Sequence, residues 1–125
     1  MGDEVMNYDI LLIEDDIETV NLLTSYFESL EISCKGVLSG FKGLKELKKY
    51  IPKVILLDII LPDINGYEIL KRINSDRKLK EIPVFFLTAI PIIEIEQKIK
   101  GLGATGVILK PFNLSDFEVL HNYLN

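Results

Sequence analysis

Ile-Leu-Leu-Ile-Glu-Asp-Asp, residues 10–16, joins four apolar residues directly to three acids. A second apolar run, Val-Ile-Leu-Leu at 54–57, likewise ends in an acid, Asp58. Continuous apolar runs of this length are typical of strands that are buried on both faces of a sheet. The last residue of each strand then lies at the rim of the core, where gathered carboxylates repel one another and lose hydration. A cation would stabilise such a cluster, and a hard divalent ion with oxygen ligands suits it best.

Short apolar runs alternate along the chain with segments whose apolar residues repeat at helical spacing. This alternation indicates βα units, which imply a parallel sheet covered by helices on both faces. Because such crossovers are right-handed, a doubly wound α/β sandwich is the predicted architecture. The strands are expected at residues 9–13, 32–37, 53–57, 83–87 and 106–109.

Apolar stripes indicate which sides of three helices face the core. We expect Asp16 to cap the first helix rather than to bind a metal, and Asn113 or Ser115 to cap the last. The stripes comprise Val20, Leu23, Phe27 and Leu30 in the first helix, Ile92, Ile95, Ile99 and Leu102 in the fourth, and Leu114, Phe117 and Leu120 in the last.

Composition excludes several classes of protein. The chain has 125 residues, enough for one domain, and a 48% hydrophobic share supplies a core. Its net charge of −5 argues against direct nucleic-acid binding, which needs a basic surface. One cysteine, Cys34, rules out an internal disulfide and fits a reducing compartment. Since neither a membrane span nor a signal peptide is recognisable, we expect a cytoplasmic protein that does not bind membranes.

Polar residues also follow the last two predicted strands. Thr88 and Ala89 come after the strand at 83–87, and Lys110 and Pro111 come after the final strand. In doubly wound sheets, ligands bind outside the carboxyl ends of the strands. Carboxylates, a hydroxyl, a free backbone N–H and an ammonium are therefore expected at one edge. This set complements a metal ion together with a phosphoryl group.

Four segments, each at a strand end, resemble the receiver domain of response regulators, the module of two-component signalling. The resemblance covers residues 8–124 and implies a flavodoxin-like sheet of five parallel strands in the order 2-1-3-4-5, with five helices. We expect a receiver domain at 8–125, preceded by a disordered lead-in at 1–7. The matching segments are Ile-Leu-Leu-Ile-Glu-Asp-Asp (10–16), Leu-Leu-Asp-Ile-Ile-Leu-Pro-Asp-Ile-Asn-Gly (56–66), Phe-Leu-Thr-Ala (86–89) and Gly-Ala-Thr-Gly-Val-Ile-Leu-Lys-Pro-Phe (103–112).

The resemblance implies a role for each acid. Asp58 would be the phosphoacceptor, a carboxylate nucleophile that attacks a phosphohistidine on a sensor histidine kinase or phosphotransfer protein. Asp15 and Asp58 would coordinate Mg²⁺, Glu14 would act largely through a metal-bound water, and Ile60 would add its backbone carbonyl. As simpler readings, Asp58 is a surface-turn aspartate, and Glu14 and Asp15 only cap the following helix.

The remaining site residues would contact the phosphoryl group. The resemblance implies that the Thr88 hydroxyl and the Ala89 N–H donate to it, and that Lys110 pairs with Asp58 and its phosphate. Pro111 would fix the backbone, in this family usually through a cis bond. Such a domain catalyses its own phosphorylation and slow dephosphorylation but is no turnover enzyme. Phosphorylation would switch the surface that binds a partner.

The chain departs from the family pattern at Val107, where an aromatic residue that moves on activation is usual. Ile90 and Ile93 fall off the fourth helical stripe and are expected to be exposed. We therefore expect a hydrophobic docking surface on the fourth helix, fifth strand and fifth helix. Its occupant would be an unknown downstream partner or a second copy of the chain.

Two alternatives come from other classes. A receiver-like interaction module that works without phosphorylation would share every motif, and Val107 keeps this alternative open. A flavodoxin-like electron carrier needs a phosphate-binding loop after the first strand, where this chain has Glu14, Asp15 and Asp16 instead. A phosphatase needs a second acid two residues after Asp58, and Ile60 stands there. Whether the chain acts alone or within a longer protein is left open by its sequence.

Overall fold

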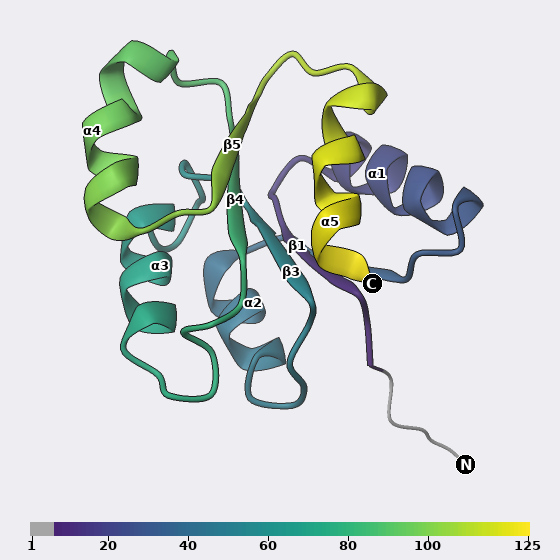
Figure 1. Ribbon diagram of the computed structural model, residues 1–125, viewed down its shortest axis with the longest axis horizontal. Helices are drawn as coiled ribbons and strands as arrows, with labels where there is room; N and C mark the ends of the chain where they lie inside the picture. The colour runs from purple at the N-terminus through teal and green to yellow at the C-terminus, as the bar shows by residue number, and fades with distance from the viewer. Residues whose placement is uncertain (1–6) are drawn as a thin grey trace.

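The computed structural model describes residues 7–125, and its five strands lie between two layers of helices (Figure 1). Along the chain, every strand is followed by helical structure. The elements are β1 (Ile10–Ile13), α1 (Ile17–Ser29), β2 (Cys34–Val37), α2 (Gly40–Glu46), β3 (Val54–Leu57), α3 (Gly66–Asn74), β4 (Val84–Thr88), α4 (Ile92–Leu102), β5 (Gly106–Leu109), the 3₁₀ helix η1 (Leu114–Leu120) and α5 (His121–Leu124).

The strands form one parallel sheet in the order β2-β1-β3-β4-β5, which confirms the predicted fold and strand order. Each observed strand lies within, or one residue beyond, its predicted range. The register pairs Ile13 of β1 with Leu57 of β3. The residues that follow, Glu14 and Asp58, therefore leave neighbouring strands at the same edge of the sheet.

Two hydrophobic clusters fill the two sides of this sheet. Leu11 and Ile13 of β1 point into the cluster beneath α2, α3 and α4, whereas Ile10 and Leu12 point into the cluster beneath α1 and η1. All four are fully buried, so β1 has no solvent-facing side. Burial of each such side chain contributes roughly 1.5–3 kcal/mol, which is why the apolar runs identify the central strands.

The first helix is capped as expected by Asp16. The Asp16 carboxylate accepts hydrogen bonds from the backbone N–H of Thr19, at 3.2 Å, and from its hydroxyl, which satisfies a free donor of the first turn. The prediction for Leu30 was wrong, since this residue is exposed. Leu30 lies after the last helical turn, and Glu31 then takes a left-handed conformation with φ of 62°, which turns the chain away from the helical stripe.

The last helix differs from the expected single α-helix. Residues 114–120 form 3₁₀ helix η1, and only the final turn, α5, is α-helical. Spacing of three residues matches the three-residue repeat of a 3₁₀ helix, which places Phe117 and Leu120 together in the core. Leu114, at the first position, stays exposed. Asn113 is the N-cap, and its backbone N–H donates to the Asp116 carboxylate at 2.8 Å.

Helix α4 follows its predicted stripe in part. Ile95 and Ile99 are buried, whereas Ile92, in the exposed first turn, is not. Ile93 is 84% exposed, as predicted. The expected exposure of Ile90 was wrong: it is half-buried and packs against the core cluster. Its backbone N–H bonds to the Thr88 side chain, so the turn before α4 keeps Ile90 close to the sheet.

Between residues 7 and 125, no helix has the length and apolar character needed to cross a membrane. The disorder expected for the lead-in at 1–7 concerns residues that lie, except for Asn7, outside the described part of the chain.

Candidate functional site at the carboxyl ends of the strands

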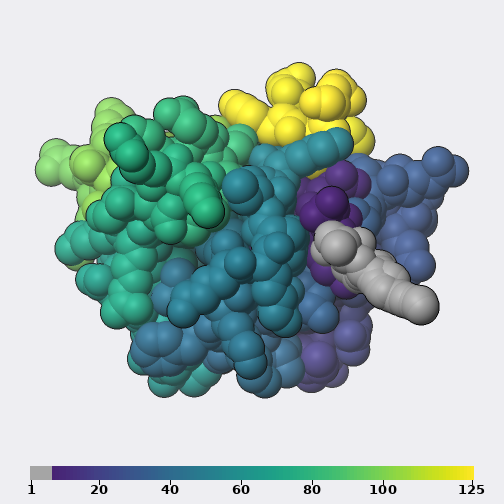
Figure 2. All heavy atoms as spheres, turned by 90° about the horizontal axis from the view of Figure 1, so that it is seen from below, coloured from purple at the N-terminus to yellow at the C-terminus, as the bar shows by residue number. Residues whose placement is uncertain are grey.

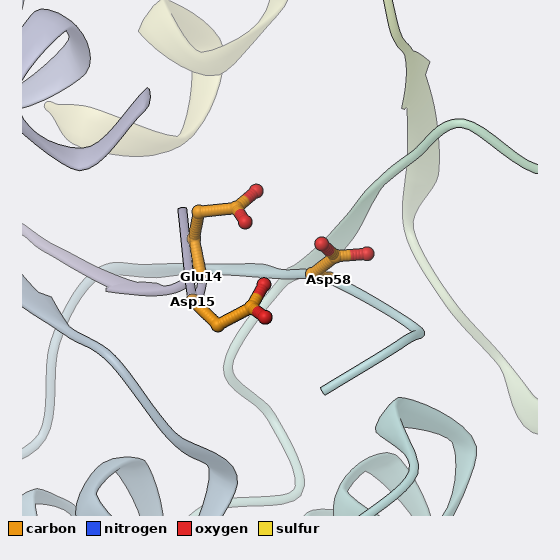
Figure 3. Close-up of side chains that lie close together, drawn as sticks. All are labelled: Glu14, Asp15 and Asp58. Atoms are coloured by element: carbon orange, nitrogen blue, oxygen red, sulfur yellow. The ribbon is translucent and has the colours of Figure 1, made fainter. Parts of the chain in front are cut away.

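Three carboxylates meet at the edge where β1 and β3 end. One oxygen from each of Glu14, Asp15 and Asp58 lies within 4.8 Å of the others. Figure 3 shows the Glu14 and Asp15 carboxylates directed toward Asp58 from neighbouring positions of one chain segment. The strand register produces this arrangement, and the Asp58 N–H fixes it by donating to the Ile13 carbonyl at 3.0 Å.

Asp58 is nearly enclosed, with 6% of its surface exposed. Its Oδ2 accepts a hydrogen bond from the Lys110 ammonium at 3.0 Å, and its Oδ1 accepts one from the Ile60 N–H at 3.3 Å. The structure thus places the backbone N–H of Ile60 on Asp58. That the Ile60 carbonyl binds metal stays a prediction.

Gly66 lies directly against the Asp58 backbone. A Cβ at this position would collide with the Asp58 carbonyl oxygen and the Ile59 Cα. The Gly66 N–H donates to the Ile59 carbonyl at 2.8 Å, which holds the first turn of α3 under the site. The sequence indicated Gly66 only as a turn into the third helix, whereas the structure requires glycine there for close approach.

Glu14 is fully buried, and both its oxygens are engaged. Oε1 accepts from the Lys110 ammonium at 2.5 Å, and Oε2 accepts from the Asp16 N–H at 3.0 Å. Burial raises the pKa of Glu14, because desolvation outweighs the hydrogen bonds from Lys110 and Asp16 that stabilise its charged form. A buried carboxylate of this kind is stabilised further by any cation that approaches it.

Lys110 bridges the two buried acids from the end of β5. Loss of hydration alone would lower its pKa, but its hydrogen bonds to Glu14 and Asp58 prevail and raise it, so the ammonium stays charged. The backbone N–H of Lys110 donates to the Thr88 carbonyl at 2.8 Å, and this bond ties the ends of β4 and β5 together. The bond between Lys110 and Pro111 is cis, in agreement with the resemblance.

The two acids after Glu14 are used differently. Asp15 is exposed at the rim and belongs to the carboxylate cluster. Asp16 caps α1 instead, and the hydrogen bond from the Thr19 hydroxyl lowers its pKa. The capping role agrees with the expectation for Asp16.

Thr88 and Ala89 lie where β4 ends, beside the end of β5. Thr88 is fully buried, and its hydroxyl oxygen accepts a hydrogen bond from the Ile90 N–H at 3.1 Å. Within residues 7–125 this hydroxyl makes no hydrogen bond to Asp58. Because a hydroxyl both accepts and donates, its proton is available for a further acceptor. Ala89 is exposed at the same edge.

The donor set fits a hard divalent cation. All three acids offer carboxylate oxygens, the ligand type that Mg²⁺ prefers. Lys110 offsets one of the three charges, so two negative charges remain when all three carboxyls are ionised. A doubly charged cation would balance them.

Sequence reasoning missed two features of this region. It paired Lys110 with Asp58 but not with Glu14, because spacing along the chain does not indicate which side chains cross between strand ends. It also passed over Asp63, whose carboxylate accepts from the N–H groups of Gly40 and Phe41 at 2.9 and 2.8 Å and so joins the β3–α3 loop to the start of α2. An acid directly after a proline in a loop was the available signal.

Known proteins resemble this chain over nearly all its length. The DivK polar-differentiation response regulator of Brucella ovis is 29% identical over 120 residues, which cover 95% of this chain and 98% of DivK. The probable transcriptional regulator ycf29 of Porphyra purpurea is 32% identical over 108 residues. That match covers 86% of this chain and 52% of ycf29, so the chain spans about half the length of this relative.

Solved structures agree with the sequence matches. The chemotaxis response regulator CheY4 of Vibrio cholerae superposes with a TM-score of 0.86 at 25% identity, covering 95% of this chain and all of CheY4. The model of the response regulator receiver domain family matches residues 10–122, from the first strand to the last helix. This chain therefore belongs to the response regulator receiver domain family of two-component signalling.

Proposed function

We propose that this receiver domain accepts a phosphoryl group on Asp58, from a phosphohistidine of a sensor kinase or phosphotransfer protein, in a Mg²⁺-dependent reaction. One observation carries the proposal: the Lys110 ammonium bridges the buried carboxylates of Asp58 and Glu14 while Asp15 completes the acidic cluster. A lone surface aspartate would have neither a fixed cation nor a gathered set of oxygen ligands.

The transfer forms one bond and breaks one. A carboxylate oxygen of Asp58 attacks phosphorus, the P–N bond to the donor imidazole breaks, and the imidazole nitrogen keeps the electron pair. Hydrogen bonds from Lys110 and the Ile60 N–H hold the Asp58 carboxylate in place for this attack. After transfer, the Lys110 ammonium is close enough to pair with a phosphoryl oxygen.

Four groups would hold the magnesium ion: the carboxylates of Glu14, Asp15 and Asp58, and the Ile60 carbonyl. When bound, the ion supplies positive charge that offsets the charge on the transferring phosphoryl oxygens. Glu14 lies deepest, and both its oxygens already accept hydrogen bonds. Its contribution through a metal-bound water, rather than direct coordination, is consistent with that position.

The phosphorylated state would recruit residues at the end of β4. The Thr88 hydroxyl can donate its proton to a phosphoryl oxygen, and the Ala89 N–H can donate beside it. Two or three charge-assisted hydrogen bonds are enough to shift a two-state equilibrium, for which about 5 kcal/mol is the extreme requirement. Because position 107 carries valine, the conformational change on phosphorylation would not involve movement of the aromatic side chain that is usual there.

The domain would act through partners rather than through turnover of a substrate. We assign residues 8–125 to the receiver, place it in the cytoplasm, and assign its output to the face of α4, β5 and α5, which presents the exposed Ile93. A downstream protein or a second copy would bind that face. Sedimentation velocity of wild type and Ile93→Glu, with and without beryllofluoride, tests the second copy; monomers throughout would exclude it.

Labelling tests the assignment of Asp58. With radioactive acetyl phosphate and Mg²⁺, wild type should take up label that hydroxylamine removes, and Asp58→Asn should take up none. Asp76→Asn, the same substitution after α3, should label like wild type. Stoichiometric labelling of Asp58→Asn would falsify the assignment. No labelling of folded wild type would favour the interaction module that works without phosphorylation.

A further inference from the structure

The charged residues of this chain are unevenly distributed. Residues 35–80 contain eleven of the fourteen lysines and arginines but only five of the nineteen acids. Residues 1–34 contain nine acids and no lysine or arginine. An acidic protein therefore carries one strongly basic segment, which includes α2 and α3. The phosphorylation site does not account for this segment, since its single lysine, Lys110, lies elsewhere.

Six of the eleven basic side chains line a groove of about 1340 Å³. Its walls are formed by α2 and the segment that connects it to β3, by the end of α3 and the segment after it, and by residues 7–9 before β1. Figure 2 shows the molecule from below, where the blue-to-green segments of this region face the viewer. Two acids also line the groove: Asp76, and Asp9, whose carboxylate lies 3.4 Å from Lys53. The basic lining consists of Lys45, Lys48, Lys49, Lys53, Arg72 and Lys78.

Apolar surface is exposed in the same groove. Phe41 and Ile51 line it with 53% and 55% of their surfaces exposed, although both are large hydrophobic residues. Tyr50 also lines it and is only 8% exposed, and its hydroxyl has no hydrogen-bond partner in the part of the chain that the structure describes. Exposed apolar residues combined with basic neighbours are typical of a surface that binds a partner.

We propose that the groove between α2 and α3 binds an acidic protein segment that carries apolar side chains. Lysine and arginine would pair with the acids of the segment, while Phe41 and Ile51 would bury its apolar residues. Charge complementarity favours such a segment over a neutral one, and the concave shape favours it over a flat membrane surface. The net charge of −5 opposes approach of a long polyanion, whereas a short segment meets only the groove.

Synthetic peptides test this proposal on the full 125-residue chain. The probes are two fluorescein-labelled peptides with equal numbers of glutamates, one interspersed with leucine and the other with serine. Fluorescence anisotropy at low and at high NaCl measures binding to wild type, to Lys45→Glu/Lys48→Glu, and to the control Lys80→Glu/Lys100→Glu. All four lysines are exposed, and the two variants change the net charge equally. Thermal unfolding establishes that both variants fold.

The glutamate–leucine peptide should bind wild type, more weakly at high salt, and about tenfold more weakly to the groove variant, because two attractive charges become repulsive. The control should change binding less than about twofold, and the glutamate–serine peptide should bind several-fold more weakly than its leucine counterpart. Equal losses in both variants, equal binding of both peptides, or no binding at about 1 mM would overturn the proposal. The proposal would also be overturned if the groove variant bound the peptide like wild type but had lost binding to anionic vesicles or self-association.

Discussion

The Lys110 ammonium lies 2.5 Å from the Glu14 carboxylate, although 96 positions separate the two residues along the chain. This contact joins the end of β5 to the end of β1 across the carboxyl edge of the sheet, and Asp58 of β3 shares the same ammonium. The lysine is therefore a structural cation of the acidic cluster, in addition to its proposed role in the phosphorylated state. Its removal should affect the folded protein before any phosphoryl transfer occurs.

We expect Lys110→Met to lower the free energy of unfolding by roughly 2–3 kcal/mol in EDTA, because Glu14 and Asp58 then lie buried without their cation. Magnesium at millimolar concentration should reduce this deficit, because the variant, whose acids have lost their lysine, should bind the ion more tightly than wild type does and so gain more stability from it. Urea unfolding in the two media measures both quantities. Lys80→Met, at an exposed lysine, should change stability by less than about 0.5 kcal/mol. An equal deficit with and without magnesium would contradict the prediction, because it would mean that no magnesium ion binds beside Lys110.

Gly66→Ala should destabilise the protein by roughly 2–3 kcal/mol, because its Cβ would collide with backbone atoms of Asp58 and Ile59 that cannot move freely. Labelling of Asp58 by acetyl phosphate should fall as well, since the collision displaces the acceptor. The matched control is Gly101→Ala in α4, where an added Cβ meets nothing within 4 Å. That variant should gain about 0.5–1 kcal/mol from the better helix former. Chemical denaturation of the two variants provides the comparison, and equal effects would refute the steric account.

The strand ends could be predicted from the sequence because burial on two faces leaves a continuous apolar run. Ile10–Ile13 and Val54–Leu57 are such runs, and the rule for parallel sheets places the acids that follow them at one edge. The register then brings Glu14 and Asp58 together without further information. The apolar stripes of the helices, by contrast, predicted burial less reliably near helix ends, as the exposed Leu30 and Leu114 show.

The failures have a common physical origin. Leu30, Ile92 and Leu114 lie at helix ends, where the next turn that would cover them is missing. Ile90 was expected to be exposed because it falls off the helical stripe of α4. It precedes that helix, however, and its turn is determined by the Thr88 side chain. The steric role of Gly66 depends on contact with Asp58, which no local pattern encodes.

Tyr50→Phe should leave stability unchanged or raise it by up to about 1 kcal/mol. The Tyr50 hydroxyl is buried and has no hydrogen-bond partner among residues 7–125, and burial raises its pKa. Removing an unsatisfied polar group avoids its desolvation cost while the ring keeps its edge contact with Tyr8. Urea unfolding of the two proteins measures the difference. A loss above about 1 kcal/mol would mean that a bound water satisfies the hydroxyl.

Cys34 should react slowly with thiol reagents while the protein is folded. Burial in β2 raises the pKa of its thiol to about 12, so the reactive thiolate is rare near pH 8. An unfolded cysteine, with a pKa of about 8.5, is roughly one-quarter thiolate at that pH. Iodoacetamide alkylation followed by mass spectrometry should therefore be at least about a hundredfold slower in buffer than in urea, and its native rate should rise tenfold per pH unit between pH 8 and 10. A native rate close to the unfolded rate would show that the thiol is neither buried nor raised in pKa.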